Sequence, residues 1–161
     1  MTPPFRTLLL VILAPVIGLG ACSKVEHLVR GGPRLPTAAL DSNIGAQIGD
    51  PTTCVLLADP KTGKVLYRYG ELFNCVRGLP ACDRPGMLTG QEALRFATLP
   101  DGRKTSCNTT PDGSRMVGWA EGVTQGTRKP YLYSAVMEGQ RALPGREMAA
   151  RLAEALPDAG L

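Results

Sequence analysis

The chain has 161 residues, a net charge of +4, 19 glycines and only 5% aromatic residues. This length supports one modest hydrophobic core rather than two, and the composition is typical of a small, loop-rich domain that needs covalent support. The single histidine, His27, precedes the predicted domain, which argues against a histidine-based metal centre or a Ser-His-Asp triad.

The first 21 residues have the pattern of a secretory signal peptide. One cation, Arg6, precedes an apolar run over residues 8–21, and small residues stand before the predicted cleavage site. This run is shorter than the roughly 20 apolar residues that span a bilayer, and Pro15 and Gly18 interrupt it. We therefore predict that residues 1–21 are removed on export.

The last four residues of this region resemble the lipobox of bacterial lipoproteins. They read Leu19-Gly20-Ala21-Cys22, and the resemblance implies that Cys22 becomes the acylated first residue of the mature chain. Each buried methylene contributes about 0.8 kcal/mol, so more than one acyl chain anchors a protein stably. Ser23 follows Cys22 where, in enteric bacteria, an aspartate would imply retention at the inner membrane. The resemblance therefore favours the outer membrane, facing the periplasm, with the inner membrane as the alternative.

The rest of the chain predicts a tether and one domain. Residues 22–46 are rich in glycine, proline and arginine and lack a hydrophobic period, so we interpret them as the lipidated N-terminus and a flexible tether. The domain covers residues 47–161. Apolar runs and turn signals predict strands over residues 53–58, 64–69, 103–108, 115–121 and 131–138. Helices are predicted over residues 91–97 and 144–156.

The order of these elements, ββαβββα, predicts an α+β fold: a small antiparallel sheet with a C-terminal helix packed on it. The helix has an apolar stripe of Met148, Leu152 and Leu156, and Glu147 and Arg151 are spaced to form an ion pair across one turn.

The four remaining cysteines predict two disulfides. An even number of cysteines in an exported domain is typical of disulfide bonding, and four cysteines allow three pairings. The short loop over residues 76–81 can close between Cys75 and Cys82, while Cys54 and Cys107 both lie in predicted strands. We therefore favour the pairs Cys75–Cys82 and Cys54–Cys107. No C-x-x-C pair occurs, so no metal site is expected.

A second resemblance concerns the sheet. Residues 57–66, Leu-Ala-Asp-Pro-Lys-Thr-Gly-Lys-Val-Leu, resemble the first hairpin of the penicillin-binding protein and serine β-lactamase fold. The strands within residues 117–138 and the terminal helix are similar to the closing strands and helix of that fold. The family needs a nucleophilic serine followed three residues later by lysine. None of the serines of the mature chain has that lysine: Ser23, Ser42, Ser106, Ser114 and Ser134.

Two triplets also depart from the family's pattern. Lys61-Thr62-Gly63 precedes Ser106-Cys107-Asn108, which reverses the family's order for its Lys-Thr-Gly and Ser-x-Asn motifs. The resemblance therefore implies a shared sheet without the helical catalytic subdomain.

Two sets of residues are candidates for a binding surface. The first combines aromatic side chains at strand spacing with one arginine: Tyr67, Arg68, Tyr69, Tyr131 and Tyr133. Aromatic residues with this period also form cores, which is the alternative. The second set is basic and suits anionic headgroups or glycans: Arg30, Arg34, Arg68, Arg77, Arg84, Arg95, Arg103 and Lys104. Ordinary surface charge is the alternative for this set.

The sequence predicts a non-enzymatic lipoprotein that is anchored in the membrane by its acyl chains and binds an envelope protein or glycan, or serves as a structural subunit. No cofactor is expected, and the periplasmic compartment argues against nucleic acid. The alternative is a hydrolase or transferase that acts on cell-wall material and is related to the penicillin-binding fold.

Overall fold

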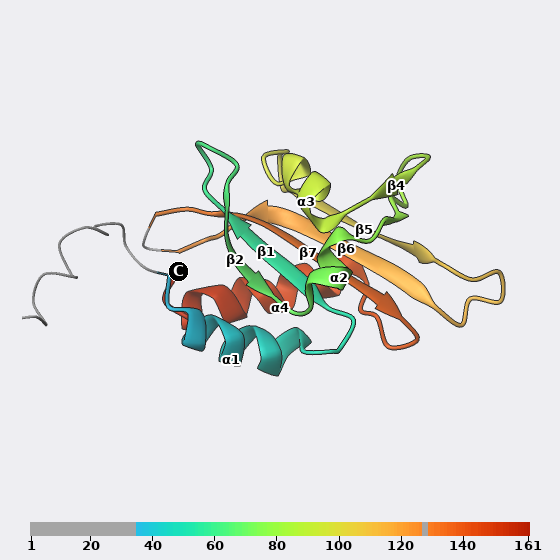
Figure 1. Ribbon diagram of the computed structural model, residues 1–161, viewed down its shortest axis with the longest axis horizontal. Helices are drawn as coiled ribbons and strands as arrows, with labels where there is room; N and C mark the ends of the chain where they lie inside the picture. Colours follow the sequence, from blue (N-terminus) through green and yellow to red (C-terminus); the bar gives the residue numbers. More distant parts are fainter. Residues whose placement is uncertain (1–34, 127–128) are drawn as a thin grey trace, which may run out of the picture. The chain divides into compact units, whose positions relative to one another are not determined.

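The computed structural model describes residues 35–126 and 129–161, which form a five-stranded antiparallel sheet covered by helices (Figure 1). The strand order across the sheet is β2-β1-β7-β6-β5. The strands are β1 (Cys54–Ala58), β2 (Val65–Tyr69), β5 (Arg103–Asn108), β6 (Met116–Val123) and β7 (Leu132–Gly139). The predicted α+β class, antiparallel sheet and C-terminal helix are confirmed.

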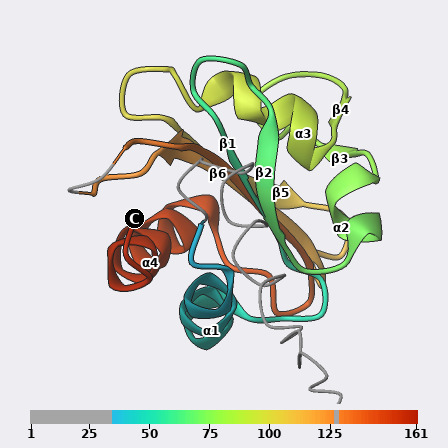
Figure 2. The same ribbon diagram turned by 60° about the vertical axis from the view of Figure 1, so that its left-hand side comes forward.

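Different parts of the chain cover the two faces of this sheet. The helices α1 (Thr37–Ile48) and α4 (Gly145–Asp158) lie side by side on one face (Figure 2). The opposite face is covered by the insert, which we define as residues 71–102 between β2 and β5. Its elements are α2 (Leu72–Val76), the ribbon of β3 (Leu79–Pro80) and β4 (Met87–Leu88), α3 (Gly90–Ala93) and the 3-10 turn Leu94–Phe96. None of the helices in the described ranges is long and apolar enough to cross a membrane.

Each face of the sheet has its own buried core. All five residues of β1 are buried, because Val55 and Leu57 pack toward α1 and α4 while Leu56 packs toward the insert. This follows from the alternation of side chains along a strand. On the insert side, Trp119 is fully buried and its Nε1 donates a hydrogen bond to the carbonyl oxygen of Pro80, at 2.8 Å.

The C-terminal helix forms as its sequence pattern predicts. Met148, Leu152 and Leu156 are buried, and Arg151 Nε donates to Glu147 Oε1 at 2.9 Å. Gly145 lets the start of α4 approach the sheet closely. A Cβ atom at this position would lie 2.0 Å from the carbonyl oxygen of Trp119, so a larger residue would push the helix away.

Helix α1 lies where the sequence predicted part of a flexible tether. Residues 37–46 are not a tether, because they form most of a helix whose Leu40, Ile44 and Ile48 are buried against the sheet. These side chains recur every fourth residue and therefore share one face of the helix. The domain starts at about Leu35, rather than at residue 47. The predicted signal peptide, Cys22, His27, Arg30 and Arg34 lie outside the described residues.

The disulfides also differ from the predicted pairs. The observed bonds are Cys54–Cys75 and Cys82–Cys107. Cys54 and Cys107 cannot pair, because β1 and β5 are separated in the sheet by β7 and β6, which places them roughly 14 Å apart at about 4.8 Å per strand. Disulfides need Cα atoms within about 7 Å. Both observed bonds join the insert to a strand of the sheet.

Candidate functional site

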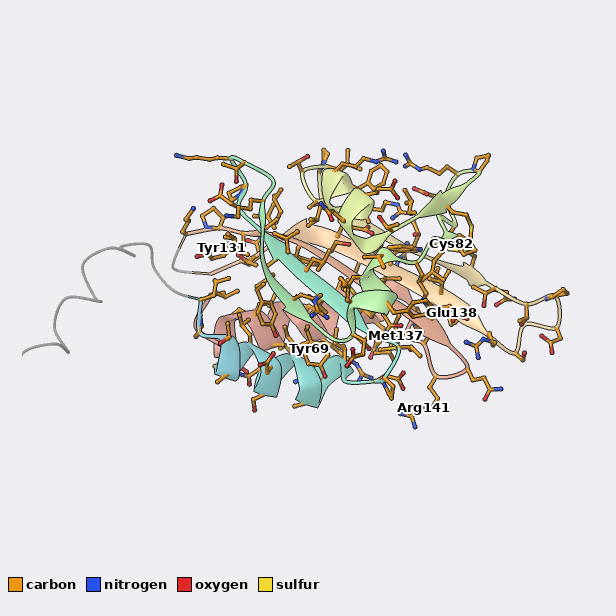
Figure 3. The ribbon with its side chains drawn as sticks, viewed as in Figure 1. Tyr69, Cys82, Tyr131, Met137, Glu138 and Arg141 are labelled. Carbon is orange, nitrogen blue, oxygen red and sulfur yellow. A yellow bond between two sulfur atoms is a disulfide. The ribbon has the colours of Figure 1, made fainter. Side chains whose placement is uncertain are left out.

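The predicted tyrosine surface is not formed. Tyr67, Tyr131 and Tyr133 are each less than 10% exposed and belong to the core under α1 and α4. Tyr69 is half-buried, and Arg68 points to the opposite side of β2, where it is exposed. Figure 3 shows Tyr69 and Tyr131 in separate places. These five side chains therefore do not combine into one recognition surface, and the alternative, that the aromatics form a core, holds for the three buried tyrosines.

The predicted basic set divides into buried and exposed members. Arg103 is almost fully buried between the sheet and the insert, and it is held by two carboxylates. Its Nε and NH2 groups donate to Asp83 at 3.0 and 3.1 Å, and its NH1 group donates to Glu121 Oε1 at 3.0 Å. The guanidinium groups of Arg84 and Arg103 lie 4.3 and 4.9 Å from the ring centre of Phe96. Arg103 is therefore part of the core rather than of a binding surface.

The pKa values of the two carboxylates in this cluster are shifted in opposite directions. Hydrogen bonds from Arg84 and Arg103 hold the pKa of Asp83 well below its usual range. Glu121 is completely buried, and burial raises its pKa to about 7 despite the neighbouring Arg103. The nearby negative charge of Asp83 also raises the pKa of Glu121. The second carboxylate oxygen, Glu121 Oε2, has no hydrogen-bond partner among the described residues. Arg103 and Glu121 are buried while Asp83 and Arg84 reach the surface, so the cluster is a pH-sensitive part of the core.

The best candidate site is a groove of about 530 Å³ at the β5 edge of the sheet, between α4 and the end of the insert. This volume lies within the range of small-molecule sites, about 300–1,000 Å³. We call it the α4 groove. One wall is formed by the small side chains of Ala149, Ala150 and Ala153 on α4. The other side is formed by residues of the sheet and the end of the insert: Ala97, Leu99, Asp101, Gly102, Lys104, Gly122, Val123, Gln125 and Tyr133.

Two glycines line the α4 groove where other parts of the chain approach them closely. Gly102 and Gly122 flank Arg103 and Glu121, which are paired across β5 and β6. A Cβ atom on Gly122 would lie 2.9 Å from the hydroxyl oxygen of Tyr133. The absence of a side chain there makes room for the tyrosine. Sequence reasoning did not single out these glycines, since their significance depends on a strand register that the sequence alone does not reveal.

Polar groups converge on this groove from three elements. Lys104 extends from β5 and Arg146 from the first turn of α4, and both are exposed. Tyr133 on β7 is 8% exposed, and its hydroxyl makes no hydrogen bond within the described part of the chain. Burial raises the pKa of Tyr133, so the hydroxyl remains a neutral donor. Of these residues, the sequence analysis selected Tyr133 and Lys104 for other reasons and missed Arg146.

A second surface feature is apolar and lies on the insert. Leu72, Phe73 and Val76 on α2 and Met87 on β4 are all more than 50% exposed. The guanidinium group of Arg77 lies 5.6 Å from the ring centre of Phe73 and forms an ion pair with Glu138 on β7. Figure 3 marks Glu138 beneath the insert. Apolar side chains gathered on a surface often mark a contact site, and none of these four side chains lines the α4 groove.

The catalytic residue types are dispersed. Ser134 is fully buried on β7, and Ser114 donates its hydroxyl hydrogen to Asp112 in a surface turn. In the ranges 35–126 and 129–161, histidine, cysteine and acidic side chains form no group of three that could hold a metal ion. No family model, no curated protein and no solved structure matches this chain.

Proposed function

We propose that this protein is an exported lipoprotein, anchored at the outer membrane through Cys22, whose domain faces the periplasm as a non-enzymatic binding module. The lipobox residues 19–22 support the anchor. The disulfides Cys54–Cys75 and Cys82–Cys107 support export, because such bonds persist in oxidising compartments.

The single observation that carries the binding role is the α4 groove. It combines an apolar wall with Lys104, Arg146 and the hydroxyl of Tyr133, which makes no hydrogen bond within the described residues. A concave, mostly apolar site with a few converging polar groups is the usual form of a small-molecule site. The envelope component that the domain recognises is therefore a small ligand, or the part of a larger one that enters this groove.

The anchor is tested by growing cells with a radiolabelled fatty acid and following the protein through membrane fractionation. We expect label on the wild-type chain, recovery with the outer membrane, and loss of both in Cys22→Ala. A Cys22→Ala chain that still fractionates with the membrane and carries label would contradict the lipoprotein assignment. Recovery with the inner membrane would contradict only the location.

The second candidate is a cell-wall hydrolase or transferase related to the penicillin-binding fold. The arrangement of the sheet favours it. β1 belongs to the hairpin that carries the resemblance and pairs directly with β7, and α4 packs on the same sheet. Covalent labelling by a fluorescent penicillin distinguishes the two candidates, because it requires an activated serine. Labelling that disappears in one serine variant would favour the enzyme, and no labelling favours the binding module.

A further inference from the structure

The α4 groove has a polar end and an apolar end. Arg146 is the second residue of α4, and Ala149, Ala150 and Ala153 follow it along the helix. Beyond Ala153 the groove adjoins a second, small cavity of about 50 Å³ beside Leu152, Leu156 and Pro157. Both cavities share Val123, Gln125, Tyr133 and Ala153 as lining residues. The lining of the site thus changes from charged to apolar from the N-terminal to the C-terminal end of α4.

The charged end carries a net positive charge. Lys104 and Arg146 line it together with one carboxylate, Asp101. Lys104 Nζ donates a hydrogen bond to the main-chain carbonyl oxygen of Asp101 rather than forming an ion pair. Neither Lys104 nor Arg146 forms a salt bridge within the described residues. The positive N-terminal end of the α4 dipole adds to the same region, because Arg146 lies in its first turn.

The hydroxyl of Tyr133, which lines the groove, is the second, independent indication of a ligand. The Tyr133 side chain is largely buried, but its hydroxyl oxygen is accessible from the groove and makes no hydrogen bond within the described part of the chain. It lines both cavities, so it lies where they join. A ligand in the groove would supply the missing acceptor.

We propose that the α4 groove binds an amphipathic anion, with a carboxylate or phosphate head between Lys104 and Arg146 and a single apolar chain along α4 toward Leu156. Tyr133 donates a hydrogen bond to an oxygen of the head or of its linkage to the chain. This inference deepens the proposed binding function and rests on it, but it does not depend on the lipid anchor.

The test is isothermal titration calorimetry of the chain from residue 22 onward carrying Cys22→Ser, with sodium decanoate as the probe. A neutral monoglyceride of the same chain length tests the charge, and decyl phosphate separates a carboxylate from a phosphate preference. We expect decanoate or decyl phosphate to bind about tenfold or more tightly than the neutral lipid, because a charge-assisted contact is lost with the latter.

Three variants locate the site. The double variant Lys104→Gln/Arg146→Gln is expected to weaken binding of the anion about tenfold or more, and Tyr133→Phe by several-fold. Ala153→Trp fills the groove from an exposed position, so it should abolish binding without unfolding the domain. The matched control is Lys64→Gln/Arg141→Gln, which removes two exposed cations outside the groove and should leave affinity unchanged.

Several results would overturn the proposal. They are a lack of binding by both anions, equal affinity for the neutral lipid, wild-type affinity in Ala153→Trp, or equal weakening by the control pair. Thermal melts of each variant identify any that fails to fold. If Cys22 is acylated but neither anion binds, the ligand inference fails alone; if decanoate binds but Cys22 is not acylated, only the anchor fails.

Discussion

Burying Glu121 beside Arg103 makes the stability of this domain depend on pH near neutrality. The folded state raises the pKa of Glu121 from 4.5 to about 7, with burial as the main cause. Between these values the folded protein keeps a proton that the unfolded chain releases. The associated stability is therefore fully present below about pH 4.5 and is lost as the pH rises through about 7.

The substitution Glu121→Gln tests this dependence. We expect the wild-type free energy of unfolding to fall by about 2 kcal/mol between pH 5 and pH 8, and the Glu121→Gln variant to lack that slope because an amide does not titrate. Urea denaturation at a series of pH values measures it. Glu147→Gln, which removes an exposed carboxylate on α4, should keep the wild-type slope. Parallel curves for the wild type and Glu121→Gln would show that another group titrates.

At the scale of elements, the disulfides fasten the insert to the sheet at two places. Cys54 on β1 binds Cys75 on α2, and Cys82 after β3 binds Cys107 on β5. Loops of 21 and 25 residues are closed by these bonds, and each closure contributes about 3 kcal/mol on a loop-entropy estimate. The insert has only short helices and a two-residue ribbon, so this covalent support compensates for little regular structure.

Digestion with trypsin without reduction tests the pairing. Cleavage after lysine and arginine, except before Pro85, separates the four cysteines into different peptides. We expect residues 35–61 linked to residues 69–77, and residues 78–95 linked to residues 105–115, as detected by mass spectrometry at low pH. A link between residues 69–77 and 78–95 would instead identify the Cys75–Cys82 pair and contradict the structure.

The sequence predicted the strands of the sheet and α4 well, because alternating or spaced apolar residues encode them directly. It did not predict the disulfide pairs, since these depend on strand order: β7, the last strand in the chain, lies between β1 and β6. Nor did it predict the α4 groove, whose lining comes from the end of the insert, β5, β6, β7 and α4. Local pattern identifies elements, while the groove and the bonds arise from contacts between distant segments.

At the scale of the whole molecule, α1 completes the core. Leu40 and Ile44 are fully buried, and Tyr67 donates its hydroxyl hydrogen to Asp41 at 2.7 Å. Arg151 NH1 of α4 also donates to the carbonyl oxygen of Gln47 at 2.9 Å. The helix was missed because its apolar stripe is diluted by small residues and follows a proline-rich segment. Its buried side chains nevertheless pack near β2 and against α4. Of these two elements, α4 lies at the opposite end of the chain.

The boundary of the domain can be tested with two truncations and one substitution. A chain that starts at Leu35 should unfold in urea at the same midpoint as one that starts at Ser23. A chain that starts at Gln47 should show no cooperative transition, because each lost apolar side chain contributes about 1.5–3 kcal/mol and small domains have only about 5–15 kcal/mol in total. Ile44→Ala should cost about 2–5 kcal/mol. The exposed neighbour Ser42→Ala should change stability by less than about 0.5 kcal/mol. Cooperative unfolding of the chain that starts at Gln47 would mean that α1 is dispensable and that its contacts with the sheet contribute little to the fold.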